Sequence, residues 1–265
     1  MLQSTYLKTS QANWIKGTAY PTAPTSLWVS LHDGDPSLTG ANEITTDVAA
    51  ARLELTASTD FSAISTVGTR RQRLIDVDIS YGNAIDDGSA TYWGLWDDDV
   101  AGNYLGGSRL LDTSGAEYTL TIVNGEEIFI GANSLIIGYP LGVFSTYFID
   151  KILGWFSGTA FGTAPTNIYA ALGANLFSHG TGTYLGIDRE IITFGSNTTV
   201  DNYVQIGNNA VVNFDNSPSA TTLNSCGFFD ASVSGNLISV GSYSDLSVAT
   251  TTPLFFNTNT VRMQF

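Results

Sequence analysis

TYLKTSQANWIKGTAYPTAPTSLWVSL, residues 5–31, has an echo at residues 146–172, which read TYFIDKILGWFSGTAFGTAPTNIYAAL. Aligned without a gap, the two stretches are identical at 11 of 27 positions, where chance would give roughly 2 at ordinary residue frequencies. The identities are a Thr-Tyr start, a tryptophan, Gly-Thr-Ala, Thr-Ala-Pro-Thr and the last leucine, and in both copies an aromatic residue follows Gly-Thr-Ala. A repeat with so long a period indicates two copies of a whole domain. We therefore expect a tandem duplication, with a first domain over residues 1–141 and a shorter second domain over residues 142–265.

Each stretch predicts a short helix followed by a buried strand. In the first half, Ser4 or Thr5 can cap the helix and Gly17 can end it in a left-handed conformation. The proline of Thr-Ala-Pro-Thr stops the helix and favours extended chain. Residues 27–31 and 168–172 are then expected to be short strands.

The rest of each half is typical of short strands joined by tight turns. Only 13% of the residues are charged, 12% are aromatic, and 27 are glycines, a composition that suits β structure. Both halves contain a hairpin sequence, GLWDDDVAGN at 94–103 and GFFDASVSGN at 227–236. The predicted fold class is all-β with one short N-terminal helix per repeat, arranged as two tandem antiparallel β-sandwich or flattened-barrel domains.

The formal charge of −14 is uneven, because residues 1–141 hold 17 acids and 7 bases and residues 142–265 hold 7 acids and 3 bases. A negative field repels phosphate, so nucleic-acid binding is not expected. No apolar run approaches the roughly 18 residues of a membrane span, and no signal peptide is visible at the N-terminus. We expect a protein made in a cytoplasm that uses neither membrane nor nucleic acid as a partner.

No catalytic or cofactor motif is found in the sequence. The two histidines, His32 and His179, fall in expected loops at positions that do not correspond between the halves. Cys226, the single cysteine, aligns with a tryptophan and is interpreted as a small core residue. The acids at 33–35 and 97–99 could attract calcium, but their spacing fits no EF-hand and they are more typical of turns. We expect no catalytic residue, no cofactor and no metal.

Arg52 and Arg189 correspond to each other, and bases are scarce in this chain. Two interpretations are open: a half-buried arginine whose head pairs with an acid, or a contact to a neighbouring subunit, where arginine is enriched. The cluster Arg70, Arg71 and Arg73 occurs only in the first half. It is predicted to meet an acidic partner or to offset the surrounding acids.

Aromatic residues gather near the first hairpin, where Trp96 and Tyr104 could form part of a sugar-stacking platform. In an alternating strand, Trp93 and Leu95 share one face while Tyr92 and Trp96 share the other. One of these faces must be core, so only part of the set can be exposed. Trp96 and Tyr104 are kept as candidate partner contacts beside the five arginines.

Three segments of the first half resemble a module found in many tailed-phage genomes. They are LHDGDPSLTGANE at 31–43, Arg52, and WGLWDDDVAGNYL at 93–105. The second half keeps the helix, Thr-Ala-Pro-Thr, Arg189 and VSGNL at 233–237, but lacks the Asp-Pro loop. Members of this family are described as virion structural proteins of the head decoration, minor tail or tail fibre kind.

The resemblance implies a non-enzymatic structural protein of a tailed-phage virion, assembled in the host cytoplasm. The leading expectation is a capsid decoration or cement protein that bridges shell subunits. The alternative is a tail, neck or collar fibre component that binds host glycan. Expected partners are the major capsid protein or tail and neck proteins, together with further copies of the chain, a trimer being favoured.

Overall fold

The computed structural model describes residues 2–112, 115–173, 188–217 and 219–265. The chain forms two compact units, and both helices contribute to each unit. Unit 1 comprises Met1–Lys8, Thr22–Tyr139 and Ile152–Phe161, and unit 2 comprises Thr9–Pro21, Pro140–Lys151 and Gly162–Phe265. The single boundary expected after residue 141 stays a prediction.

The two helices begin and end as the sequence predicts. They are α1 (Thr5–Ile15) and α2 (Thr146–Phe156). The Ser4 hydroxyl accepts the backbone N–H of the third residue after it, 3.1 Å away, and Ser145 caps α2 in the same way. Gly17 and Gly158 follow the helices with positive φ, which supplies the left-handed conformation that ends each of them. Neither helix is long and apolar enough to cross a membrane.

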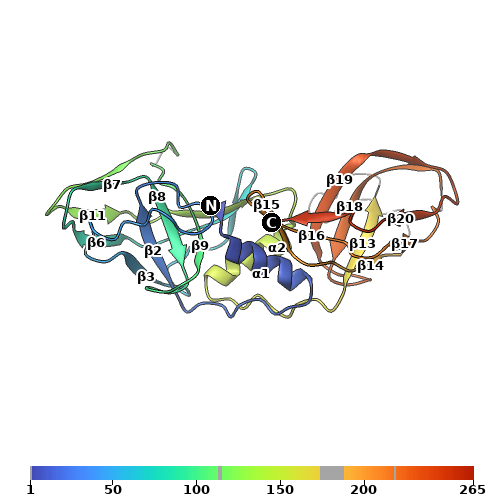
Figure 1. Cartoon of the computed structure of the whole chain (residues 1–265), viewed down its shortest axis with the longest axis horizontal. Helices are drawn as coiled ribbons and strands as arrows, with labels where there is room; N and C mark the ends of the chain where they lie inside the picture. The colour runs from blue at the N-terminus through green and yellow to red at the C-terminus, as the bar shows by residue number, and fades with distance from the viewer. Residues whose placement is uncertain (1, 113–114, 174–187, 218) are drawn as a thin grey trace. The chain divides into compact units, whose positions relative to one another are not determined.

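The main sheet of unit 1 is antiparallel and has the strand order β1-β9-β8-β2-β3 (Figure 1). Its strands are β1 (Leu2–Gln3), β2 (Ser26–His32), β3 (Arg52–Thr56), β8 (Tyr92–Trp96) and β9 (Tyr104–Arg109). Three smaller sheets complete the unit, with orders β12-β5-β4, β11-β6 and β10-β7. Their strands are β4 (Ser65–Val67), β5 (Arg70–Leu74), β6 (Ile79–Asn83), β7 (Gly88–Ala90), β10 (Leu120–Ile122), β11 (Glu127–Ile130) and β12 (Ile136–Pro140).

The main sheet of unit 2 has the order β14-β13-β18-β19, again antiparallel throughout. Its strands are β13 (Ile168–Gly173), β14 (Glu190–Ile192), β18 (Thr221–Phe229) and β19 (Leu237–Val248). Two further sheets have orders β15-β16-β21 and β17-β20. They consist of β15 (Thr198–Val200), β16 (Tyr203–Gly207), β17 (Val212–Phe214), β20 (Leu254–Phe256) and β21 (Arg262–Gln264).

The two main sheets follow one plan. Read from its other edge, the unit 1 sheet runs β3-β2-β8-β9, and β14-β13-β18-β19 takes the corresponding strands in the corresponding order. A short segment also covers the last strand in both units, because Gln3 pairs with Gly106 and Phe144 bridges to Ser239. The all-β class predicted from the sequence is confirmed. A tandem duplication predicts such a shared plan, and the duplication itself stays a prediction from the sequence.

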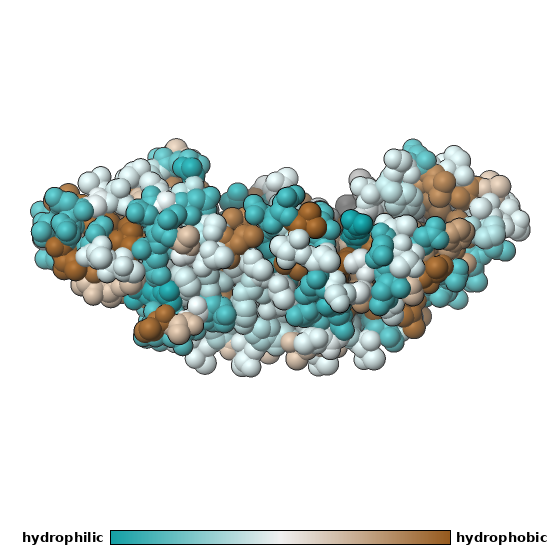
Figure 2. Space-filling view, in the orientation of Figure 1, coloured by the Kyte–Doolittle hydropathy of each residue, from teal (hydrophilic) through white to brown (hydrophobic). Residues whose placement is uncertain are grey.

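The core of each unit is apolar, and the predicted strands after Thr-Ala-Pro-Thr lie inside it. Leu27, Val29 and Leu31 of β2 are fully buried, as are the apolar side chains on one face of α2. On the surface, apolar residues form small patches separated by polar residues on the face shown in Figure 2. The pairing of β2 with β3 and β8 places Ser30 beside Arg52 and His32 beside Tyr92.

Candidate functional site

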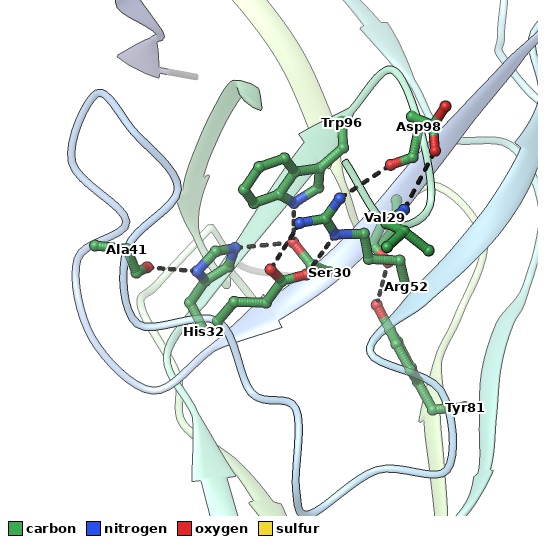
Figure 3. A network of polar contacts seen from close by, with 10 residues as sticks. Val29, Ser30, His32, Ala41, Arg52, Tyr81, Trp96 and Asp98 are labelled. Carbon is green, nitrogen blue, oxygen red and sulfur yellow. Dashed lines mark hydrogen bonds and ion pairs between the residues drawn. The ribbon is translucent and has the colours of Figure 1, made fainter. Parts of the chain in front are cut away.

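Arg52 is the centre of a polar network at the edge of the main sheet of unit 1 (Figure 3). Its Nε and Nη2 donate to the two carboxylate oxygens of Glu43 at 2.6 and 2.9 Å. Its guanidinium lies over the ring of Trp96, 3.5 Å from the ring centroid, and its Nη1 donates to the Asp98 carbonyl at 3.0 Å. The side chains of Arg52 and Glu43 are only 9% and 13% exposed. The arginine therefore joins the loop after β2, strand β8 and the β8–β9 turn.

The β8–β9 turn is held by hydrogen bonds of its own. The Asp97 carboxylate accepts the backbone N–H of Asn103 at 2.5 Å and the Asn103 side-chain amide at 2.8 Å. The Asp98 carboxylate accepts the Val100 N–H, and this bond lowers the pKa of Asp98, so the group is ionised at neutral pH. Gly102 approaches the Asp98 backbone so closely that a Cβ there would lie 2.4 Å from its nitrogen. The turn is thus a rigid frame rather than an open loop.

Unit 2 repeats this construction with different side chains. Arg189 lies over the ring of Phe229, 3.6 Å from the centroid, and its Nη1 donates to the Ala231 carbonyl at 3.0 Å. The Asp230 carboxylate accepts the backbone N–H and the side-chain amide of Asn236 at 2.6 and 2.9 Å. The same arginine, aspartate and asparagine therefore hold the hairpin turn in both units. Arg52 pairs with the acid Glu43, whereas Arg189 contacts the Phe229 ring and the Ala231 carbonyl, and a role of either arginine in a subunit contact stays a prediction.

His32 belongs to the end of β2 rather than to the loop expected from the sequence. Its Nδ1 donates to the Ala41 carbonyl at 2.7 Å, which leaves Nε2 to accept the Ser30 hydroxyl at 2.8 Å. The Trp96 indole N–H donates to the same hydroxyl oxygen at 2.8 Å. Burial lowers the pKa of His32, so the ring is neutral at pH 7. The histidine fixes the loop 33–43 to the sheet.

The Ser30–His32 pair has the separation of a nucleophile and its base, but both side chains are fully buried. No substrate can reach the Ser30 hydroxyl. The second ring nitrogen of His32, Nδ1, bonds to the Ala41 carbonyl, whereas a catalytic histidine usually has a carboxylate at this position. Burial also raises the pKa of the Cys226 thiol to about 11, so this cysteine is protonated and unreactive at neutral pH. His179 lies outside the described residues. The described residues contain no group of three or more His, Cys, Asp or Glu side chains that could hold a metal ion.

Trp96 and Tyr104 lie inside unit 1, only 8% and 4% exposed, with their rings packed edge to face at 5.1 Å between centroids. Gly40 of the loop 33–43 fits against the Trp96 ring, where a Cβ would come within 2.4 Å of a ring carbon. The loop 33–43 thus covers the face of β8 that carries Trp96. The alternation of the sequence could not show that both faces of this strand are covered. These two rings have no exposed face on which a sugar could stack.

The basic cluster divides into different roles. Arg73 is half-buried and donates to the Ser62 carbonyl at 2.7 Å and to the Leu153 carbonyl at 3.2 Å, which ties β5 to the end of α2. Burial lowers its pKa from the usual value. Arg70 is exposed, and Arg71 donates to the hydroxyl of Thr66 at 2.9 Å. Arg70 therefore lies at the surface, Arg71 is half-buried and bonded within its own hairpin, and Arg73 stabilises the unit.

A family model described as podophage GP4 fiber I protein gp80 matches residues 3–138 of the 265 in the chain. The chain belongs to this family. No curated protein matches it. The fiber I match shows a family of tailed-phage virion structural proteins, as the resemblance of the sequence implied. The matched range contains most of unit 1, including the arginine network and the β8–β9 turn.

Sequence reasoning missed an exposed apolar residue of this fiber I module, at the apex of the β8–β9 turn. Val100 is 81% exposed there, and Val233 is 78% exposed at the corresponding apex in unit 2. The alignment of the two halves contained the signal, because DDDVAGN and DASVSGN keep the valine along with the aspartate, glycine and asparagine. An exposed valine at the same place in both turns marks them as candidate contact surfaces.

Proposed function

We propose that the chain is a component of the tail, neck or collar fibre apparatus of a tailed phage, and that it acts by contact with other virion subunits. The match of residues 3–138 to the fiber I family carries this proposal. The family name describes a fibre, so it favours the alternative drawn from the sequence over the leading expectation of a capsid decoration protein.

The arrangement of polar groups supports a non-enzymatic role. In the part of unit 1 that the structure describes, the histidine and serine that come closest to a catalytic pair are sealed in the interior, and Arg52 is occupied by Glu43. These groups hold loops and turns in fixed positions. A scaffold with rigid, outward-pointing turns suits a protein whose task is to hold neighbours in place.

Glycan binding through Trp96 and Tyr104 is not part of the proposal, because both rings are buried. The proposal needs only protein–protein contacts made by the exposed turns.

Copy number and position on purified virions test the proposal. Quantitative mass spectrometry should find the protein at about 6, 12 or 18 copies per particle, the numbers that tail and collar symmetries allow. The major capsid protein of the same sample serves as the internal standard. Gold-labelled antibody should then bind at the tail or neck in electron micrographs. Hundreds of copies spread over the head would overturn the fibre assignment, and absence from virions would overturn the virion assignment as well.

A further inference from the structure

Each hairpin turn has a frame that the fold requires and an apex that the fold does not explain. Of the four residues shared by DDDVAGN and DASVSGN, the aspartate and asparagine bond to each other, and the glycine allows a close backbone approach. The shared valine does neither. Val100 and Val233 expose nearly their whole side chains to water, so their burial contributes almost nothing to folding. An apolar side chain held on a rigid frame is suited to docking on another surface.

A second pair of corresponding hairpins presents another exposed valine. In unit 1, β4 and β5 form a hairpin in which Val67 pairs with Arg70, and in unit 2, β15 and β16 form one in which Val200 pairs with Tyr203. Val67, Val200 and Tyr203 all expose about half of their surface to solvent. β4 is the edge strand of its sheet, and every residue from 65 to 70 is exposed. This hairpin can therefore receive a partner along its edge.

The β8–β9 turn and the β4–β5 hairpin of unit 1 carry opposite charges, and the corresponding turn and hairpin of unit 2 lack these charges. In unit 1, Asp98 and Asp99 stand beside the apex valine, and the β4–β5 hairpin carries Arg70 and Arg71. In unit 2, the apex valine has neutral neighbours instead, and the arginines are replaced by uncharged residues. At the apex the replacements are Ala231 and Ser232. On β16, the exposed Tyr203 stands where Arg70 stands on β5, the next residue, Val204, is buried in the core, and one carboxylate, Asp201, is added in the β15–β16 turn. Two surfaces that meet would change their charges in this matched way.

Other bases of unit 1 are already engaged within the unit. Lys8 is buried, Arg52 pairs with Glu43, and Arg109 pairs with Glu117. Arg71 is half-buried and donates to the Thr66 hydroxyl of its own hairpin, whereas Arg70 is exposed and pairs with the exposed Val67. The complement of the acidic apex is therefore present on the chain itself.

We propose that the 97–103 turn of one molecule docks on the β4–β5 hairpin of a second molecule of the same chain. Val100 packs against Val67, while Asp98 and Asp99 face Arg70 and Arg71. The contact joins two different surfaces, so it is heterologous and repeats from molecule to molecule, closing into a ring such as a trimer. The corresponding contact in unit 2 uses Val233 and the β15–β16 hairpin, with apolar and neutral neighbours. This inference concerns assembly and goes beyond the place of the protein on the virion.

The test measures self-association of the full chain by sedimentation velocity and light scattering over a concentration series up to about 100 µM. Reversing the apex (Asp98→Arg with Asp99→Arg) should weaken association at least tenfold, and so should reversing the hairpin (Arg70→Asp with Arg71→Asp). The chain with all four changes restores opposite charges across the contact and should associate within about threefold of the wild type. Raising the salt from about 50 mM to 1 M should weaken wild-type association, since it shortens the Debye length to about 3 Å.

Two further variants separate docking from folding and from net charge. Val100→Ser leaves the hydrogen bonds of the turn in place and should weaken association about tenfold without changing thermal unfolding. Asp86→Arg with Asp87→Arg matches the apex reversal in charge change at an exposed site elsewhere in unit 1, and it should leave association unchanged. A wild-type chain that stays monomeric at about 100 µM overturns the proposal. So does a reversed apex that associates normally, or a four-change chain as weak as either reversal alone.

Discussion

Replacing Arg52 by methionine removes the head of the arginine and keeps most of its stem. The Glu43 carboxylate then loses both of its hydrogen bonds while it stays about nine-tenths buried. Removing one partner of a buried ion pair costs about 3–5 kcal/mol, because the other charge is left uncompensated. The pair here keeps slight exposure, so we expect the lower part of that range, about 3 kcal/mol. The hydrogen bond to the Asp98 carbonyl and the stacking on Trp96 are made by the same guanidinium. Their loss is therefore included in this free energy and is not added to it.

The assay is thermal and urea unfolding of the full chain, with a tryptophan signal that reports mainly on unit 1, which holds four of the five tryptophans. A cost of about 3 kcal/mol lowers the midpoint by about 10 °C for a unit of this size. Combining Arg52→Met with Glu43→Leu removes both charges and should cost about 2–3 kcal/mol less than the sum of the single changes. Arg189→Met is the matched variant, and it should destabilise unit 2 instead. A cost below about 1 kcal/mol for Arg52→Met, typical of a surface ion pair, would refute the buried network.

Three further outcomes follow from the same site. Because burial lowers the pKa of His32 below its ordinary 6.5, the unfolded chain takes up the proton first as the pH falls. Stability should therefore decline below about pH 6.5, and the decline should be smaller in His32→Asn, measured by midpoints across pH. Gly40→Ala combines a positive φ with a clash on Trp96 and should cost about 2–4 kcal/mol in urea unfolding, whereas alanine at the open Gly68 should cost about 1 kcal/mol. Cys226 should react with a thiol reagent only after unfolding, and rapid labelling of the native chain would contradict its burial and its raised pKa.

Local patterns predicted the elements that depend on local physics. The serine caps, the glycines after the helices and the Thr-Ala-Pro-Thr bend all act within a few residues of one another, and the structure places them as predicted. The hairpin over 94–103 was predicted for the same reason, since its turn residues bond to each other. These features occur in both halves of the sequence, so each half supports the prediction made from the other.

The sequence offered an acid as one partner of Arg52 but could not identify which residues contact it, because only the fold brings them to the arginine. Glu43 lies in a loop nine residues earlier, and Asp98 lies 46 residues later in the β8–β9 turn. Strand alternation also failed for Trp96. It assigns one face of β8 to the core and leaves the other open, but the loop 33–43 closes over that second face. Only the fold brings this loop, with Gly40 at the ring, onto the strand.

The comparison of the two halves separates residues that hold the fold from residues that choose a partner. The arginine, aspartate, glycine and asparagine shared by the two hairpins each make a hydrogen bond or a close backbone approach that holds the turn. The residues between them are free to change, and they changed from two acids beside Val100 to neutral residues beside Val233. If the apex had no partner, no reason would remain to keep a valine there while its neighbours varied. A kept apolar apex with variable charges around it suits one mode of docking used twice, with the surrounding charges deciding which surface each apex meets.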